Sequence, residues 1–156
     1  MFVRSFAHPF LGLVALVVFA ACDAQRDESG AISEAGDVSV FSIQIGDCFD
    51  DADDGEVMEV GGIPCGEPHD NEVYALFDLV DDAWPGDEAV NETAGAGCRE
   101  RFAAAIGADY EDSILMFYPM TPTQGSWDEL DDREVVCVAY HMEQEKLTGS
   151  VLGSGM

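Results

Sequence analysis

The sequence predicts an α+β fold, with a small, mostly antiparallel sheet, one main helix and two disulfides that staple them together. Short apolar segments of strand length occur both before and after a single long segment with helical periodicity. The chain has 156 residues, of which 47% are hydrophobic, and this is enough for one domain with its own core. Four cysteines fall within that domain, an even number that favours disulfides in an exported protein.

The N-terminal residues have the pattern of an export signal. Arg4 precedes the apolar run FLGLVALVVFAA at 10–21. This run is shorter than the roughly 20 residues that are needed to cross a bilayer. It therefore predicts a signal peptide and not a stable membrane span.

The apolar run ends in FAAC at 19–22, which resembles a bacterial lipobox. In a lipobox, small residues give the peptidase access, and the cysteine thiol receives diacylglycerol before cleavage makes it the new N-terminus. Phe19 stands where Leu is usual, but it is also too bulky for a conventional cleavage site, which is the competing interpretation. We expect a lipoprotein signal peptide at 1–21, a lipidated Cys22, and a protein held at the cell membrane on its extracytoplasmic side.

The chain is strongly acidic, with 32 Asp and Glu against 6 Lys and Arg and a formal net charge of -26. Nucleic acid, anionic lipid headgroups and wall polyanions need basic residues to replace their counterions, so this composition disfavours all three as partners. Besides the membrane, which is reached through the lipid, we expect an envelope or division protein with a basic surface. The alternative is that the charge serves only solubility.

The residues that follow Cys22 predict a tether. DAQRDESGAISEAGDV at 23–38 is polar and has no sustained periodicity, a composition typical of flexible linkers. The sequence is therefore divided into the signal peptide, an acidic flexible tether at 22–37, and a folded domain at 38–156.

Three strands are predicted before the helix. VSVFSIQIG at 38–46 alternates apolar with small or polar residues, and the acidic turn DDADDGE at 50–56 comes soon after it. VMEVGGIPC at 57–65 and NEVYALFDLV at 71–80 give the second and third strands.

The main helix is predicted to begin after Pro85 and Gly86, with Asp87 as its N-cap, and to end at Gly107. Its apolar stripe recurs near the helical period at Val90, Ala94, Cys98, Phe102 and Ile106.

Two further strands are predicted after the helix. SILMFYP at 113–119 and REVVCVAYHM at 133–142 are separated by the loop MTPTQGSWDELDD. KLTGSVLG at 146–153 could add an edge strand.

With Cys22 assigned to lipid, the other four cysteines allow three pairings. Cys48 and Cys65 flank the first hairpin-like region, whereas Cys98 lies on the apolar stripe of the helix and Cys137 in the middle of a late strand. We predict the disulfides Cys48–Cys65 and Cys98–Cys137, the second of which would join helix and sheet. A zinc site is the alternative, but the chain contains no CxxC pair.

The acidic turn at 50–56 does not match a calcium-binding loop. Aligning Gly55 with the invariant glycine of an EF-hand puts Ala52 at a ligand position and Gly61 where a bidentate Glu is required. We interpret the segment as a solvated acidic turn.

The segment IPCGEPHDNEVY at 63–74 holds the densest set of polar side chains, and this candidate binding motif comprises Glu67, His69, Asp70 and Glu72. A histidine beside carboxylates could bind a metal or transfer protons. If the disulfides bring the two regions together, His141 could join His69 in a metal site. We favour a structural His69, hydrogen-bonded beside the Cys65 disulfide.

No other pattern indicates catalysis. The serines, including Ser113 and Ser126, lack a GxSxG setting, and the glycine-rich stretches do not follow the strand-to-helix fingerprint of nucleotide binding. We therefore predict no catalytic residues, no metal ligands and no cofactor, in a protein that is not an enzyme.

A family resemblance covers most of the predicted domain. It is carried by IGDCFDD, IPCGEPHDNEVYALFDL, WPGDEAV, GCRERFAAAIG, YPMTPTQGSW and DREVVCVAYH. This succession resembles the septum-formation domain family of high-GC Gram-positive bacteria, from about residue 45 to residue 155. The resemblance implies an extracytoplasmic domain on a lipid anchor or a single membrane span, in a cell-envelope setting linked to division-septum formation. It supplies no reaction, cofactor or catalytic residue.

These observations favour a lipid-anchored binding or adaptor module of the cell envelope. The first alternative is a metal-binding protein or metal-assisted enzyme centred on His69 and His141. The second is a structural spacer, in which substitutions at the motif would change stability and no interaction.

Overall fold

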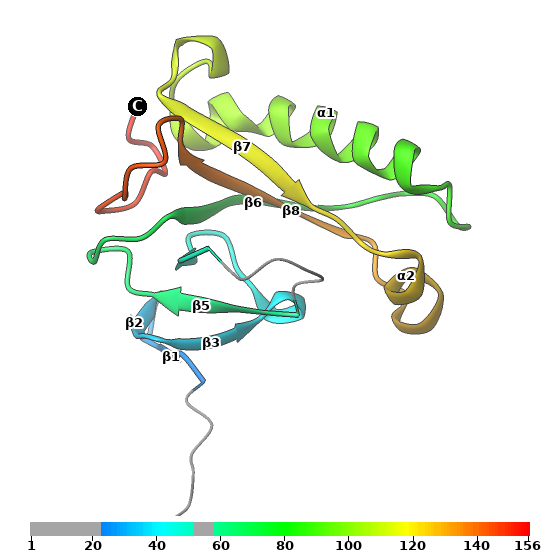
Figure 1. Cartoon of the computed structure of the whole chain (residues 1–156), viewed down its shortest axis with the longest axis horizontal. Coiled ribbons are helices and arrows are strands. Elements are labelled where there is room, and N and C mark those ends of the chain that lie inside the picture. Colours follow the sequence, from blue (N-terminus) through cyan, green and yellow to red (C-terminus); the bar gives the residue numbers. More distant parts are fainter. Residues whose placement is uncertain (1–22, 52–57) are drawn as a thin grey trace, which may run out of the picture.

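The computed structural model describes residues 23–51 and 58–156 (Figure 1). The predicted signal peptide, Cys22 and most of the acidic turn at 50–56 lie outside the described residues. In chain order the elements are β1 (Gln25–Arg26), β2 (Ile32–Glu34), β3 (Gly36–Ser39), the 3-10 helix η1 (Val40–Ser42), β4 (Cys48–Phe49), β5 (Glu59–Ile63), β6 (Asn71–Asp78), α1 (Asp87–Ile106), the 3-10 helix η2 (Tyr110–Asp112), β7 (Leu115–Met120), α2 (Gln124–Leu130) and β8 (Glu134–His141).

Six of the strands form one sheet in the order β3-β5-β4-β6-β8-β7, and all of its pairings are antiparallel. β1 and β2 form a separate two-stranded sheet. α1 lies along β6, β8 and β7, whereas β3 and β5 lie on the side away from this helix (Figure 1). The predicted α+β class, with a mainly antiparallel sheet and one main helix, is confirmed; α2 is a short second helix.

The buried stripe of α1 is the predicted one, since its buried residues are Val90, Ala94, Cys98, Phe102 and Ile106. Gly107 ends the helix with a left-handed φ of 90°, and its N–H donates to the carbonyl of Ala103. The N-cap is Gly86, one residue before the predicted Asp87, which lies instead in the first turn with Glu88. Both carboxylates there complement the helix dipole. No helix within residues 23–51 and 58–156 has the length and apolar composition to cross a membrane.

Both predicted disulfides are present. Cys48–Cys65 joins β4 to the turn after β5, with 5.3 Å between the Cα atoms. Cys98–Cys137 joins α1 to β8, with a Cα separation of 5.4 Å. Because such links lower the conformational entropy of the unfolded chain, each contributes about 3 to 4 kcal/mol to the free energy of unfolding.

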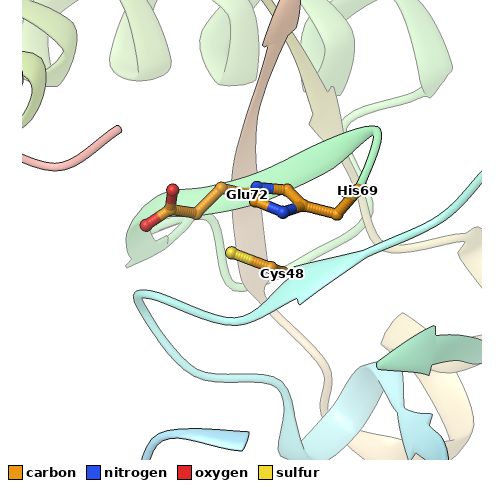
Figure 2. A group of neighbouring side chains, drawn as sticks. All are labelled: Cys48, His69 and Glu72. Atoms are coloured by element: carbon orange, nitrogen blue, oxygen red, sulfur yellow. The ribbon is translucent and has the colours of Figure 1, made fainter. Parts of the chain in front are cut away.

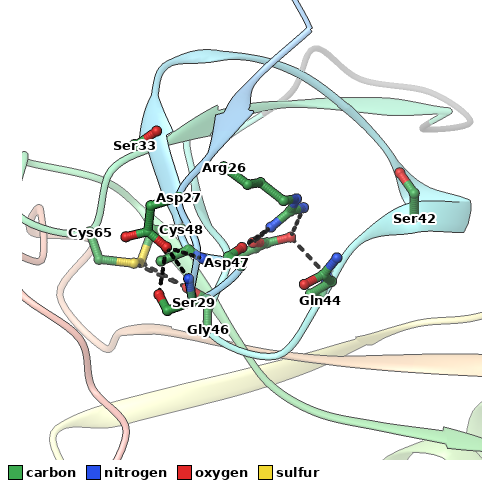
Figure 3. Close-up of polar contacts among 12 residues, drawn as sticks. Arg26, Asp27, Ser29, Ser33, Ser42, Gln44, Gly46, Asp47, Cys48 and Cys65 are labelled. Carbon is green, nitrogen blue, oxygen red and sulfur yellow. Dashed lines mark hydrogen bonds and ion pairs between the residues drawn. A yellow bond between two sulfur atoms is a disulfide. The ribbon is translucent and has the colours of Figure 1, made fainter.

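The segment predicted to be a flexible tether, 22–37, is folded from β1 onward. β1 pairs with β2, and Ile32 is buried in the core. Arg26 donates to both carboxylate oxygens of Asp47, at 2.5 and 2.7 Å, and Asp47 is only 2% exposed (Figure 3). The prediction was wrong because the segment is held by contacts with distant residues, such as the pairing of β3 with β5 and the ion pair of Arg26 with Asp47, which local composition does not reveal.

Two further segments differ from their predictions. The first predicted strand is interrupted by η1, so that only β3 at its start belongs to the sheet before β4. The loop predicted after β7 contains α2, whose N-terminus is capped by a capping box between Thr123 and Ser126. A serine takes the place of the usual Glu or Gln in that box, which explains why the pattern gave no clear signal.

The predicted edge strand at 146–153 is not a strand. It makes a single bridge, in which Leu147 and His69 exchange backbone hydrogen bonds. Gly149 and Gly153 then adopt positive φ angles, which break the extended conformation. The segment is held by bonds to Cys65, Glu72 and α1 and not by a neighbouring strand.

The sheet separates two hydrophobic clusters. Val135, Cys137 and Ala139 of β8 belong to the cluster beneath α1, whereas Val136 and Val138 belong to the cluster on the other face. This alternation is the two-residue period of a strand buried on both faces. The second cluster also contains Ile32, Val38, Ile43, Phe49, Val60 and Val73.

Two glycines of α1 offer a matched test of its packing. A Cβ on Gly97 would come within 2.3 Å of the Phe77 ring, which is held from above by Arg101, whereas a Cβ on Gly95 would meet nothing within 4 Å. We expect Gly95→Ala to raise the free energy of unfolding by about 0.5 to 1 kcal/mol through helix propensity. Gly97→Ala should lose this gain because Phe77 must move. Denaturant unfolding of both variants measures the difference, and equal gains would contradict this packing.

Candidate functional site

The candidate binding motif does not form a single site. His69 and Glu72 are fully buried, Asp70 is half-buried, and Glu67 is exposed in the turn before β6. β5 and β6 lie on either side of β4 and both pair with it antiparallel, and Cys65 in the segment between them is fixed to β4 by its disulfide. The motif therefore divides into a buried part and a surface part.

His69 is held by hydrogen bonds to the backbone. Its N–H and carbonyl bond to Leu147 at 3.1 and 2.8 Å, and its ring Nδ1 lies 2.8 Å from the carbonyl oxygen of Glu67. Because a carbonyl only accepts, Nδ1 donates this hydrogen bond. Nε2 is buried and has no hydrogen-bond partner among the described residues. The hydrogen bond that was predicted for His69 is present, and its partner is a backbone carbonyl.

Glu72 is a buried carboxylate in the middle of the sheet. It accepts hydrogen bonds from the Ser150 hydroxyl and the Val151 N–H, both at 2.6 Å. Burial raises the pKa of Glu72 above its ordinary value, although these two bonds and the charge of His69 act in the opposite direction. The C-terminal segment thus supplies the donors that a buried carboxylate requires.

One set of side chains in the described ranges has the spacing of a metal site, and it differs from the predicted one. Ligand atoms of Cys48, His69 and Glu72 all lie within 4.8 Å of one another (Figure 2). The Cys48 sulfur is bonded to Cys65, however, so no thiolate is available. His141, whose Nδ1 accepts the N–H of Glu143, is not a member of this group, and no group of three possible ligands in the described ranges contains both histidines.

The surface part of the motif is tied to the acidic turn. Lys146 donates to Asp50 and Asp70, at 2.6 and 2.8 Å, and the Asp51 N–H donates to Asp70 at 3.1 Å. Although burial raises the pKa of Asp70, these hydrogen bonds hold it below its ordinary value overall. Asp70 therefore stays ionised and helps to fix the chain at Asp51.

Asn71 was not among the predicted site residues, yet it bonds to residues on the face of the sheet that lies opposite α1. Its Nδ2 donates to the Asp51 carboxylate at 2.8 Å, and its Oδ1 accepts from the Tyr118 hydroxyl at 3.3 Å. Asn71 is only 1% exposed. Both of its partners line a groove.

This groove, of about 750 Å³, lies on the face of the sheet opposite α1. Phe49, Val60 and Val136 of the second hydrophobic cluster line it. Its other lining residues come from η1 and β5 on one side and from the end of β7 and α2 on the other. Figure 1 labels β5, β7 and α2. A smaller hollow of about 230 Å³ shares Asp51 and Tyr118 with the groove. Sequence patterns missed the groove because its walls belong to elements that were predicted as parts of a strand and a loop.

The groove is acidic at its margin. Its charged lining residues are Asp51, Glu129, Asp132 and Glu134, with no Lys or Arg from the described part of the chain. Burial, followed by repulsion from Asp78 and Asp132, raises the pKa of Glu134. The margin thus concentrates negative charge beside an apolar surface.

Each of the five basic side chains in the described part of the chain is already engaged. Four form ion pairs, which are Arg26 with Asp47, Arg99 with Glu111, Arg133 with Asp131, and Lys146 with Asp50 and Asp70. Arg101 donates to the Gly97 carbonyl at 2.9 Å and stacks on Phe77 at 4.1 Å. These residues therefore offer no uncommitted cation to an anionic ligand.

Comparison with known families identifies one match. The family model described as septum formation matches residues 15–137, which contain all four disulfide cysteines, the motif and the whole of α1. No curated protein and no solved structure matches the chain.

The buried carboxylate of Glu72 gives a pH-dependent prediction. Because its folded pKa is raised, its contribution to stability is present below the ordinary value of 4.5 and is lost as pH rises through the folded pKa. In Glu72→Gln the amide oxygen can accept from the Val151 N–H and the amide NH2 can donate to the Ser150 hydroxyl, and the side chain does not ionise. Across that pH range, the free energy of unfolding of the wild type should fall relative to this variant.

Chemical denaturation from pH 4 upward measures this difference, with the exposed Glu88→Gln as a control for the loss of one charge. Parallel profiles for wild type and Glu72→Gln would show that the folded environment does not disfavour the charge.

Proposed function

Because the chain belongs to the septum-formation family, we propose that it is a non-enzymatic, lipid-anchored binding module on the extracytoplasmic side of the cell membrane. Family membership links it to septum formation and to the cell envelope. Its proposed role is that of an adaptor, which binds an envelope or division protein that presents a basic surface.

This proposal rests on two observations together: the chain is strongly acidic, and its described Lys and Arg side chains are already bonded within the protein. The chain has 32 acidic residues, and the described basic side chains are all bonded within the protein. A surface of this kind attracts basic partners from a distance and repels anionic polymers. The buried positions of His69 and Glu72 favour a structural role for the centre of the motif, which supports binding over catalysis.

Cys22 is the proposed attachment point. We expect Cys22→Ser, expressed as the full precursor, to lose incorporation of a fatty-acid label and to leave the membrane fraction. The wild type should keep both. Labelling with an alkyne fatty acid, followed by fractionation, measures the two properties. A Cys22→Ser protein that remained acylated would place the lipid at another residue.

The proposed partner can be sought by crosslinking the lipidated, full-length protein in cells and identifying the captured proteins by mass spectrometry. We expect envelope or division proteins with basic extracytoplasmic segments. Their binding to the purified domain should weaken as salt is raised, because exposed charges are screened. The non-lipidated Cys22→Ser variant is the control for capture that requires the membrane. Captured partners whose affinity does not change with salt would contradict an electrostatic adaptor.

A further inference from the structure

The groove opposite α1 collects exposed apolar side chains. Phe41 is 47% exposed, Met58 is 51% exposed and Leu130 is 61% exposed, and all three line it. Below them lie Phe49 and Val60, which belong to the second hydrophobic cluster. Large exposed apolar side chains that gather around one hollow are typical of a binding surface.

The charges at the margin of the groove restrict what can occupy it. Asp51 follows β4. Glu129 lies on α2, Asp132 lies between α2 and β8, and Glu134 begins β8. The carboxylates therefore come from two parts of the chain that are far apart in the sequence and that both line the groove. An anionic ligand would be repelled, and so would a second copy of this chain, whose net charge is -26. A cation placed near Glu134 would offset its repulsion by Asp78 and Asp132.

We propose that this groove binds a short peptide segment in which apolar side chains alternate with Lys or Arg, an inference that rests on the proposed function and names the chemistry of its partner. In an extended segment, alternate side chains point in opposite directions. One set enters the apolar groove between Phe41 and Leu130. The basic side chains start on the opposite face of the segment, and their length lets them bend to the carboxylates at the margin. The apolar contacts supply affinity, and the charges supply orientation and rapid association.

Asp70 of the candidate motif and its neighbour Asn71 hold residues that line this groove. Asn71 bonds to Asp51, which follows β4, and to Tyr118 of β7, and both of these residues line the groove. Asp70 holds the backbone of Asp51, and Lys146 holds Asp70. Asn71 is therefore a positioning residue for the groove and does not line it.

The direct test uses a fluorescein-labelled heptapeptide, KLKFKLK, and measures its binding to the mature domain by fluorescence anisotropy. We expect ELEFELE, which reverses the charge, and KSKSKSK, which lacks apolar side chains, to bind at least tenfold more weakly. Binding of KLKFKLK should also weaken as salt rises. Equal binding of KLKFKLK and KSKSKSK would overturn the proposal, because it would indicate diffuse charge attraction alone. The absence of binding would overturn it as well.

Variants locate the binding on the molecule. Leu130→Gln and Met58→Gln should each raise the Kd of KLKFKLK by about tenfold, since each removes apolar contact area. Glu129→Gln and Asp132→Asn should each raise it by about 2- to 5-fold. The matched controls lie outside the groove and are Val80→Gln, at a residue that is 94% exposed, and Glu88→Gln on α1. Equal effects of groove and control variants would overturn the assignment.

Two measurements separate the remaining outcomes. Sedimentation velocity tests for a dimer, and a dimer that is lost in Leu130→Gln would identify the groove as a contact between copies and overturn the peptide assignment. Crosslinking in cells with Leu130→Gln separates the two proposals. If Leu130→Gln captures a basic partner as well as the wild type does, the proposal that the groove binds the partner is refuted, whereas the adaptor function stands. Peptide binding in the groove without a captured cellular partner would refute the adaptor function instead.

Discussion

The fold depends on the buried carboxylate of Glu72, because burial of a carboxylate costs free energy unless hydrogen-bond donors surround it. Glu72 lies on the central strand β6 and is not exposed, so its oxygens need hydrogen-bond donors. Those donors come from Ser150 and Val151, far along the chain. This requirement explains why an irregular C-terminal segment packs firmly on a sheet without joining it. Two bonds between His69 and Leu147 hold the same segment at its other end.

Neighbouring residues of β6 serve opposite faces of the sheet. Glu72 bonds to the C-terminal segment, and Tyr74 packs in the cluster beneath α1 with its hydroxyl on the Cys98 carbonyl. Asn71 and Val73 belong to the other side, where the second cluster and the groove lie. A single strand thus connects the disulfide-linked half of the core to the surface that we assign to binding. Substitutions within the motif are therefore expected to alter stability and recognition together.

Local patterns predicted those parts of the structure that depend on local physics. The stripe of α1 and the long strands β6 and β8 are strongly periodic, and the positions of Cys98 and Cys137 on them indicated their pairing. The folded start of the domain was missed because it depends on a pair between Arg26 and Asp47, which are 21 residues apart. The groove was missed for a similar reason. Its apolar residues follow no period within one element and meet only when the sheet brings its two ends together.

If the chain is anchored at Cys22 as proposed, the early start of the folded structure would set how far the domain can move. Only residues 23 and 24 separate Cys22 from β1, and the Ala24 N–H already donates to Asp37. With Cys22 as the proposed anchor, the segment from Cys22 to the start of β1 can span about 10 Å at most when fully extended. Such a domain stays in a thin layer above the lipid, where partners meet it by lateral diffusion and at high effective concentration. Weak contacts with a membrane-bound partner would then suffice, whereas a partner deep in the wall would be out of reach.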